Sequence, residues 1–238
     1  MKPVRADLSL QDKPLFTANL LGDFQNQQEI QMAKKLLLEL GLSINYLLPQ
    51  QIKSNILQGV DININHRPVA ETMIQKRVEC RFGRPFITVS FFGPSETAGA
   101  LRDIGTVLGL PIRKTEGIIR EGLAAVSHGI NCYGAELYRK KVLLLLEGCQ
   151  REIVSRVLAD LGMSVIYTPG KRNYYTPESL HRIDDKYKID LIAGEDDRLL
   201  QNRNPPFLLL SDHGESWLGF KGFTNFARSI SEILREKY

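Results

Sequence analysis

The stretch FGRPFITVSFFGPSETAGALRDIG, Phe82–Gly105, is the most informative part of this chain. A short apolar segment, Pro85–Phe92, runs into the turn Gly93-Pro94, and an amphipathic helix opens at Ser95-Glu96-Thr97. A strand, a turn and a helix in this order form the repeating unit of α/β folds. The stretch therefore predicts one strand–helix unit, and the sequence on both sides repeats the pattern.

The N-terminal half contains four short apolar runs that predict strands. They lie at Leu15–Leu21, Leu42–Leu48, Val60–Ile64 and Pro85–Phe91. Between the first two, apolar residues recur at helical spacing from Asn26 until Gly41 stops the pattern. A second helical segment reaches Gly59, and a third spans Val69–Phe82. Strands and helices therefore alternate throughout this half.

The same alternation restarts near Lys141. Its expected strands are Val142–Leu146, Met163–Tyr167, Ile189–Ala193 and Phe207–Leu210. The first of these is continuously apolar, which is typical of a parallel sheet covered on both faces. Helices are expected from Gly148 to Gly162, from the capping sequence Thr176-Pro177-Glu178 onward, and over Phe220–Arg235.

Alternation of this kind predicts an α/β fold with two Rossmann-like domains, each a parallel sheet flanked by helices. We place the first domain at residues 1–110 and the second at 137–238. Residues 111–136 have a helical composition interrupted by glycines, and we interpret them as a helical connector.

Charge and hydropathy exclude several classes of protein. The 238 residues include 31 basic and 27 acidic side chains, which give a formal net charge of +4. Nucleic-acid-binding proteins usually show a denser basic patch interleaved with aromatic residues. No apolar run approaches the roughly 20 residues that span a bilayer, and no secretory signal is visible. We expect no nucleic-acid partner, no membrane association and a cytoplasmic location.

Three widely spaced cysteines, Cys80, Cys132 and Cys149, occur without a CxxC pair. An odd number of cysteines without metal-ligand spacing argues against a disulfide framework or a zinc site. We expect free, buried thiols, because unpaired cysteines commonly behave as small core residues.

Motifs for phosphate binding are missing from this sequence. Neither GxGxxG nor GxxxxGK[ST] occurs, so the sequence lacks the cradles of dinucleotide-binding and P-loop proteins. Two interpretations remain open for the helix starts at Gly22–Asn26 and Gly148–Arg151. They are anion-binding sites that use free N–H groups, or they are ordinary helix starts. His66-Arg67 and His213 follow strands, where ligands of open α/β sheets bind, although a single histidine is more often an ordinary polar residue.

Longer segments resemble one family. NLLGDFQNQQEIQMAKKLLLELGL (Asn19–Leu42) resembles the opening of the middle domain of nitrogenase component 1 subunits, and Phe82–Gly105 is similar to a later part of that domain. VLLLLEGCQREIVSRVLADLGMSVI (Val142–Ile166) and PFLLLSDHGESWLGFKGFTNFAR (Pro205–Arg228) resemble the last domain. The resemblance covers nearly the whole chain in the family's order, and it is closest to the α-type and cofactor-scaffold branch.

The resemblance implies a fold and also a loss of ligands. Family subunits have three such domains, and the first carries the cysteines of an iron–sulfur cluster. This chain aligns from the second domain on, so we expect those ligands to be absent. The cysteine that binds the family's metal cofactor falls at Arg67, its histidine ligand falls near Leu210, and a pocket arginine falls at Gln150. Arginine and leucine cannot replace thiolate and imidazole as iron ligands.

These correspondences leave no expected catalytic residue or metal ligand in the chain. The candidate cofactor-binding residues are His66, Arg67, Gly148, Gln150, Arg151 and His213. We expect no cofactor held by this chain alone, although a partner could supply an iron–sulfur cluster or metallocofactor. Arg67 and Arg151 predict an electropositive cleft suited to an anionic ligand.

Two functions remain open at this point. One is a nitrogenase component 1-like oxidoreductase polypeptide, or the C-terminal part of one, which binds a reducible substrate or cofactor between its domains beside a cluster-bearing partner. The other is a non-catalytic module that carries or assembles a metallocofactor or tetrapyrrole, or docks a partner. In either case the expected partner is another nitrogenase-like subunit or a second copy of the chain.

Overall fold

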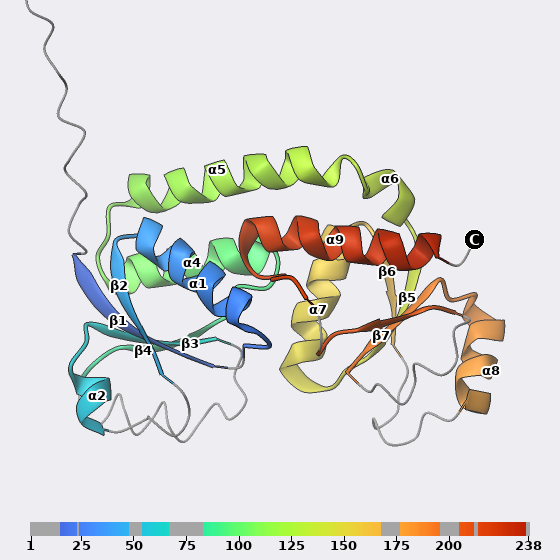
Figure 1. Ribbon diagram of the computed structural model, residues 1–238, viewed down its shortest axis with the longest axis horizontal. Coiled ribbons are helices and arrows are strands. Elements are labelled where there is room, and N and C mark those ends of the chain that lie inside the picture. Colours follow the sequence, from blue (N-terminus) through green and yellow to red (C-terminus); the bar gives the residue numbers. More distant parts are fainter. Residues whose placement is uncertain are drawn as a thin grey trace, which may run out of the picture.

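Two α/β lobes lie side by side beneath a shared layer of helices (Figure 1). The computed structural model describes residues 15–22, 24–47, 54–66, 83–167, 177–195, 205–211 and 214–236. We call the part built around strands β1–β4 the N-lobe and the part built around β5–β8 the C-lobe. Each lobe contains a sheet of four parallel strands.

The N-lobe sheet has the order β2-β1-β3-β4. Its elements are β1 (Phe16–Gly22), α1 (Gln27–Glu39), β2 (Leu42–Tyr46), α2 (Ser54–Gln58), β3 (Ile62–His66), β4 (Phe86–Val89) and α4 (Pro94–Val107). Helix α1 begins at Asn26, whose side chain accepts a hydrogen bond from the Glu29 N–H, as an N-cap residue does. It is followed by Gly41, which has a φ of 98°.

The C-lobe repeats this order as β6-β5-β7-β8. Its elements are β5 (Lys141–Leu145), α7 (Gly148–Asp160), β6 (Ser164–Ile166), α8 (Pro177–Tyr187), β7 (Leu191–Gly194) and β8 (Phe207–Leu209). Gly162, with a φ of 74°, follows α7 as Gly41 follows α1. Both glycines supply the left-handed conformation that ends a helix.

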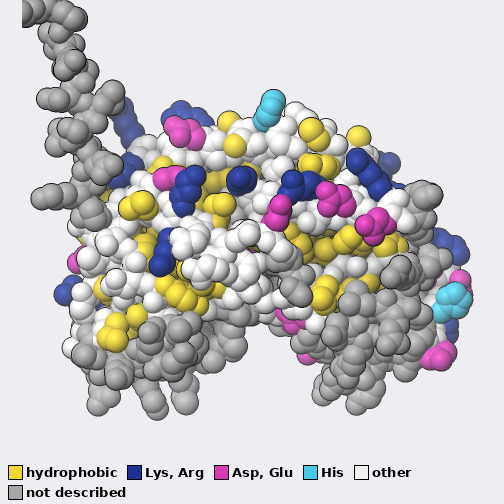
Figure 2. All heavy atoms as spheres, in the orientation of Figure 1, with side chains coloured by type: hydrophobic (Ala, Val, Ile, Leu, Met, Phe, Trp, Pro, Cys, Tyr) yellow, Lys and Arg dark blue, Asp and Glu magenta, His cyan; other side chains and the backbone are white. Residues whose placement is uncertain are grey.

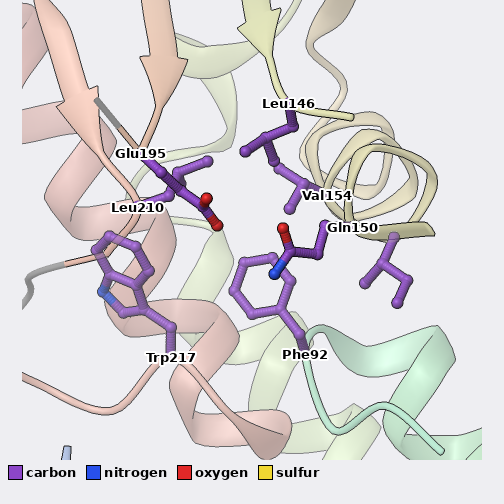
Figure 3. A pocket seen from close by; sticks show the side chains of 8 residues that line it. Phe92, Leu146, Gln150, Val154, Glu195, Leu210 and Trp217 are labelled. Atoms are coloured by element: carbon purple, nitrogen blue, oxygen red, sulfur yellow. The ribbon is translucent and has the colours of Figure 1, made fainter. Parts of the chain in front are cut away.

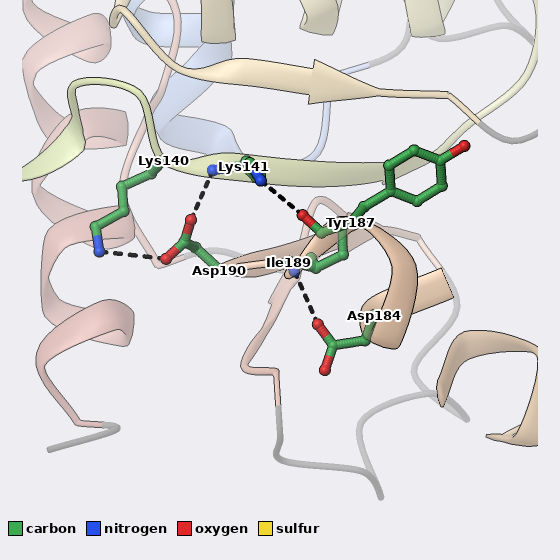
Figure 4. Close-up of polar contacts among 6 residues, drawn as sticks. All are labelled: Lys140, Lys141, Asp184, Tyr187, Ile189 and Asp190. Carbon is green, nitrogen blue, oxygen red and sulfur yellow. Dashed lines mark hydrogen bonds and ion pairs between the residues drawn. The ribbon is translucent and has the colours of Figure 1, made fainter. Parts of the chain in front are cut away.

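One aspartate in each lobe clamps the first strand to the third. The Asp61 N–H donates to the Thr17 carbonyl at 2.9 Å, and the Asp61 carboxylate accepts from the Thr17 N–H at 2.8 Å. In the C-lobe, the Asp190 N–H donates to the Lys141 carbonyl at 2.9 Å, and its carboxylate accepts from the Lys141 N–H at 2.8 Å (Figure 4). The two lobes therefore share one mechanism for setting strand register.

The residues around Asp190 also set the end of α8. The Asp184 carboxylate accepts from the Ile189 N–H at 2.7 Å, and the Lys141 ammonium donates to the Tyr187 carbonyl at 2.8 Å (Figure 4). The Lys140 ammonium lies 3.2 Å from the Asp190 carboxylate. These contacts direct the chain from α8 into β7 beside β5.

The opening sequence stretch joins the two lobes. Phe92, which follows β4, forms an isolated antiparallel bridge with Leu218. Gly93 has a φ of 89°, and a Cβ atom there would lie 2.6 Å from Cγ2 of Val157 on α7. Only glycine fits this position, because both the backbone conformation and the contact with the C-lobe exclude a side chain.

The helix layer consists of α5 (Ile112–Ile130), α6 (Gly134–Leu137) and α9 (Gly219–Arg235). Helix α9 packs against α1 and α4 of the N-lobe, against α5 and α6, and against β8 of the C-lobe. Its apolar face is rich in aromatic residues and includes Phe220, Phe223 and Phe226. The main hydrophobic core consequently contains residues from both lobes.

Charges of both signs alternate on the outer surface of this layer (Figure 2). Arg102 of α4 pairs with Glu116 of α5 at 2.6 Å, and Arg235 of α9 pairs with Glu136 of α6 at 2.8 Å. Exposed pairs of this kind contribute little to stability. The layer is held mainly by its buried face.

The α/β architecture with two parallel sheets is confirmed, and the observed strands lie within a few residues of those expected. Strand β3 begins and ends two residues later than expected, because the chain enters it from the Asp61 clamp. Residues 111–136 form α5 and α6, and the domain borders stay a prediction because α9 packs on both lobes. The expected helix Val69–Phe82 lies outside the described residues.

Cys132 corrects one expectation, because its free thiol is exposed rather than buried. It lies in the turn between α5 and α6, away from either sheet. Cys80 and the side chain of Cys149 fall outside what the structure describes. In the described parts of the chain, no helix combines the length and apolar character of a membrane span.

The close approach of α5 and α9 predicts a sharp cost for Gly122→Ala. A Cβ atom at Gly122 would lie 2.2 Å from Cδ2 of Phe220, so the helices must separate. We expect a loss of about 1–3 kcal/mol in the free energy of unfolding, measured in urea. The matched control is Gly117→Ala, where the Cβ meets nothing within 4 Å and helix propensity adds up to about 1 kcal/mol. Equal effects at both sites would contradict the packing argument.

The Asp61 clamp predicts a pH-dependent contribution to stability. Hydrogen bonds from the Thr17 N–H and hydroxyl lower the pKa of Asp61 below its ordinary value. A lowered folded-state pKa gives stability that is present above the unfolded pKa of about 3.9 and is lost as pH falls through the folded value. Asp61→Ala should therefore destabilise at pH 7, with the difference shrinking below about pH 4. Asp185→Ala, at an exposed position on α8, is the control, and urea unfolding across pH is the measurement.

Candidate functional site

A pocket lies at the seam between the lobes, at the carboxyl ends of the C-lobe strands (Figure 3). Leu146, Glu195 and Leu210 are the first residues after β5, β7 and β8, and all three line it. The complete lining is Phe92, Leu146, Gln150, Ile153, Val154, Glu195, Leu210 and Trp217. Ligands of open α/β sheets bind in this position relative to the strands.

Aromatic contacts with α9 hold one wall of the pocket. Phe226 packs edge-to-face against Phe92 and Trp217, with ring centroids 5.2 Å and 5.0 Å apart. Phe92 comes from the N-lobe and Trp217 from the segment that leads into α9. The wall therefore exists only when the lobes and α9 are assembled together.

Two polar side chains face each other across this apolar pocket. Figure 3 shows the Gln150 amide, from the first turn of α7, and the Glu195 carboxylate, from the end of β7, both directed inward. Among the described lining residues no lysine or arginine occurs. The ionisable group in the described lining is thus a carboxylate. The electropositive cleft expected from Arg67 and Arg151 stays a prediction, because Arg67 lies outside the described residues.

The pocket is narrow. About 20 Å³ is open to the centre of a water molecule, which is little more than the space one water needs. A ligand larger than water therefore requires movement of the lining side chains or of the lobes.

Of the six candidate residues, Gln150 lines the pocket and Gly148 begins α7 with a φ of 63°. Arg151 is adjacent in sequence, but its guanidinium lies over the ring of Tyr167, 5.9 Å from the centroid. Successive helical residues point in different directions, so Arg151 is not part of the lining. Its proposed role in binding an anion stays a prediction. Arg67 and His213 lie outside the described residues.

His66 is fully buried at the end of β3 and does not line the pocket. Its ring lies between Phe24 and Phe91, with centroids 4.8 Å and 5.5 Å away. Nδ1 accepts a hydrogen bond from the Phe91 N–H at 3.3 Å, which describes a neutral ring with its proton on Nε2. A ligand-binding role for His66 stays a prediction, while its contacts position the residue that precedes Phe92.

The start of α1 is occupied by the protein's own side chains. The Glu29 N–H donates to Asn26, and the Glu29 carboxylate accepts from the Gln25 N–H at 2.9 Å. Glu29 is fully buried there. The Asn26 side chain therefore satisfies the Glu29 N–H, and the Glu29 carboxylate satisfies the Gln25 N–H. A role of this helix start in binding an anion stays a prediction.

The pocket does not fit a metal cluster ligated by this chain. Among the residues described, no three His, Cys, Asp or Glu side chains gather to hold a metal ion. Gln150 and Leu210, aligned by resemblance with the family's arginine and histidine, both line the pocket. Leucine offers no donor, and soft iron clusters require thiolate or imidazole.

Sequence reasoning missed the other contributors to the wall. Glu195 is not among the candidate residues, although its position directly after β7 is a signal for the strand-end edge. Phe92 and Trp217 carry no such local signal. Their proximity depends on a contact between segments more than a hundred residues apart, which periodicity does not reveal.

The chain is a two-lobed α/β protein, with one parallel sheet in each lobe and a pocket at the seam between them. A family model described as "Nitrogenase component 1 type Oxidoreductase" matches residues 9–235. The chain therefore belongs to the nitrogenase component 1 type oxidoreductase family. This confirms the resemblance seen in the sequence.

Relatives include proteins of cofactor assembly and of nitrogenase itself. The nitrogenase iron-molybdenum cofactor biosynthesis protein NifE of Mesorhizobium japonicum is 26% identical over 231 residues, covering 88% of this chain and 45% of the relative. The nitrogenase molybdenum-iron protein alpha chain of Methanothermococcus thermolithotrophicus is 20% identical over 252 residues, covering 92% and 52%. The chain thus spans about half the length of the curated relatives it matches.

Solved structures share the fold. "Nitrogenase Cp1 at pH 6.5" superimposes with a TM-score of 0.78 at 15% identity, covering 94% of this chain and 59% of the other. The AdcAII protein of Streptococcus pneumoniae gives a TM-score of 0.58 at 8% identity, covering 92% and 99%. At these identities the similarity concerns the fold alone.

The aromatic wall predicts a spectroscopic effect of Phe226→Leu. Trp217 is the only tryptophan and is 3% exposed, so its emission reports on the wall. Shortening Phe226 should lower the free energy of unfolding by about 1–3 kcal/mol, red-shift the native emission and increase quenching by acrylamide. Phe207→Leu on β8, outside this cluster, should leave the native emission unchanged. An unchanged spectrum in Phe226→Leu would contradict the described packing.

Proposed function

We propose that this chain is a binding module of the nitrogenase component 1 type, which holds a cofactor or its precursor at the seam between its lobes. In this proposal the cargo's iron is ligated by a partner, while this chain supplies apolar surface and hydrogen bonds. The observation that carries the proposal is the strand-end pocket, whose lining includes Gln150 and Leu210, the residues that the resemblance places at ligand-contacting positions.

The polar groups of the pocket support holding over catalysis. Gln150 cannot transfer a proton at neutral pH, and Glu195 is the only ionisable side chain in the described lining. An acid–base pair would require two titratable groups in reach of one substrate. An amide and a carboxylate are instead suited to orient a ligand whose body contacts Phe92 and Trp217.

The names of the relatives also support a binding function. Several are named as NifE, a protein of iron-molybdenum cofactor biosynthesis. Relatives named as nitrogenase alpha chains are single chains of a larger protein. We therefore propose a nitrogenase-like subunit or a second copy as the partner, and the cytoplasm as the location.

A second candidate is the oxidoreductase itself. The family model and the alpha-chain relatives favour it. In this version, the partner would bring an iron–sulfur cluster to the seam, and the lobes would bind the reducible substrate. The described lining supplies no thiolate or imidazole for the reacting metal, so this version depends on the partner for those ligands.

A titration with isolated iron-molybdenum cofactor tests the binding function. Under anaerobic conditions, the cofactor should quench the fluorescence of Trp217 and raise the melting temperature by mass action. Gln150→Ala and Glu195→Gln should each weaken binding about five- to tenfold, the effect of one lost hydrogen bond of about 1 kcal/mol. Asp185→Asn, at a surface position on α8, should bind normally. No quenching, or equal affinities for all variants, would refute binding at the pocket.

Purification from the native host distinguishes the two candidates. The complex should be isolated anaerobically, followed by iron analysis and EPR. For the binding module we expect a partner that carries iron. The bound group should be retained through dithionite reduction and should be released unchanged. A group that is reduced and then reoxidised by substrate would favour the oxidoreductase. Absence of both iron and a partner would contradict a partner-supplied cluster.

A further inference from the structure

A groove between α4 and α7 lies beside the seam pocket and opens on the surface of the protein. About 280 Å³ of this groove is open to the centre of a water molecule, against about 20 Å³ of the pocket. Its lining includes the exposed residues Ser95, Asp103 and Glu152. It also includes the buried apolar residues Val89 and Ala100. The lining therefore changes from polar at the surface to partly apolar at depth.

Helix α7 forms the wall between the two cavities, and among the described lining residues Ile153 is the one that they share. An α-helix turns by about 100° per residue, so Ile153 lies about 60° from Gln150 on one side and about 60° from Arg156 on the other. Gln150 belongs to the lining of the pocket and Arg156 to the lining of the groove. The side chain of Ile153 therefore divides the groove from the pocket.

Contacts between the lobes beside this wall oppose a hinge motion that would open the pocket. Val157 of α7 occupies the space that Gly93 leaves free. The Ser95 hydroxyl of α4 donates to the Asp160 carboxylate of α7 at 3.0 Å. A hinge motion would break these contacts together and would also separate α9 from one of the lobes. Movement of a lining side chain is the smaller change that gives access to the pocket.

We propose that the groove is the entrance to the seam pocket and that Ile153 is its gate. A β-branched side chain in a helix has one strongly preferred χ1 rotamer, which keeps the gate closed at rest. Displacement of this side chain joins the two cavities into one, with a polar outer part and an apolar inner part. The entry route rests on the geometry of the described residues, and its use by a cofactor or precursor rests on the proposed function.

Acrylamide quenching of Trp217 tests the gate without any ligand, because this residue lines the pocket and is the only tryptophan in the sequence. Ile153→Ala should raise the Stern–Volmer constant about twofold or more, since the quencher then reaches the pocket from the groove. Ile30→Ala is the matched control. Ile30 is also a helical isoleucine, is 8% exposed against 9% for Ile153, and belongs to the described lining of neither cavity. An unchanged constant in Ile153→Ala, or an equal rise in Ile30→Ala, would overturn the proposal.

Blocking the groove shows whether the quencher enters by that route. Gly99 lines the groove, and an added Cβ there would meet nothing within 4 Å. Gly99→Phe, introduced into the Ile153→Ala variant, should therefore fill the groove and return the Stern–Volmer constant to its wild-type value. Gly117→Phe, at an open helical glycine of α5, should leave the constant raised in the same background. A constant that stays raised with Gly99→Phe would place the entrance elsewhere and overturn the proposal.

Circular dichroism and melting temperature establish that each variant is folded before quenching is compared. The quenching experiments contain no cofactor, so their outcome is independent of the cofactor titration. Failure of the gate would leave binding at the pocket standing, and failure of the cofactor to bind would leave the gate standing. The two proposals are therefore refuted by different measurements.

Discussion

The packing of α9 against both lobes is the contact on which the rest of the structure depends. The chain crosses from β8 to the N-lobe, where α9 begins beside α1, and the helix then runs back toward α6 (Figure 1). Near its start, Phe220 lies against α5 where Gly122 leaves room. Phe226, further along the same face, supports Phe92 and Trp217. Thus one amphipathic helix sets the separation of the upper helices and the shape of the seam pocket. Two sheets with few direct contacts become one hydrophobic core.

Much of this fold could be predicted from the sequence because its signals are local. The turn at Gly93-Pro94, the cap at Asn26 and the continuous apolar run of β5 each specify their own element. The clamps of Asp61 and Asp190 were not predicted, since an aspartate before a strand resembles any turn residue. Such a clamp is recognisable only from the pairing of the strands, and the same pair of hydrogen bonds occurs in both lobes.

The candidate site could be predicted only in part, because it also depends on contacts between distant segments. The family resemblance selected Gln150, which lines the pocket, while the helix start selected Arg151, which turns to Tyr167. Which helical neighbour faces a seam depends on the partner surface, and that surface is formed by Phe92 and Trp217 from distant segments. The lining described at this edge contains an amide and a carboxylate but no thiolate or imidazole.

Gly93, in the opening stretch of sequence, is a point of steric contact between the two lobes. Its missing side chain admits Val157 of the other lobe, and its backbone conformation turns the chain into α4. The two positions are thus one steric unit divided between distant parts of the chain. Because the φ of 89° keeps position 93 a glycine, the size of the side chain at 157 is the one that is free to vary, and a larger residue there would displace the turn. The turn motif Gly93-Pro94 is thus shaped by a contact between the lobes as well as by its own backbone.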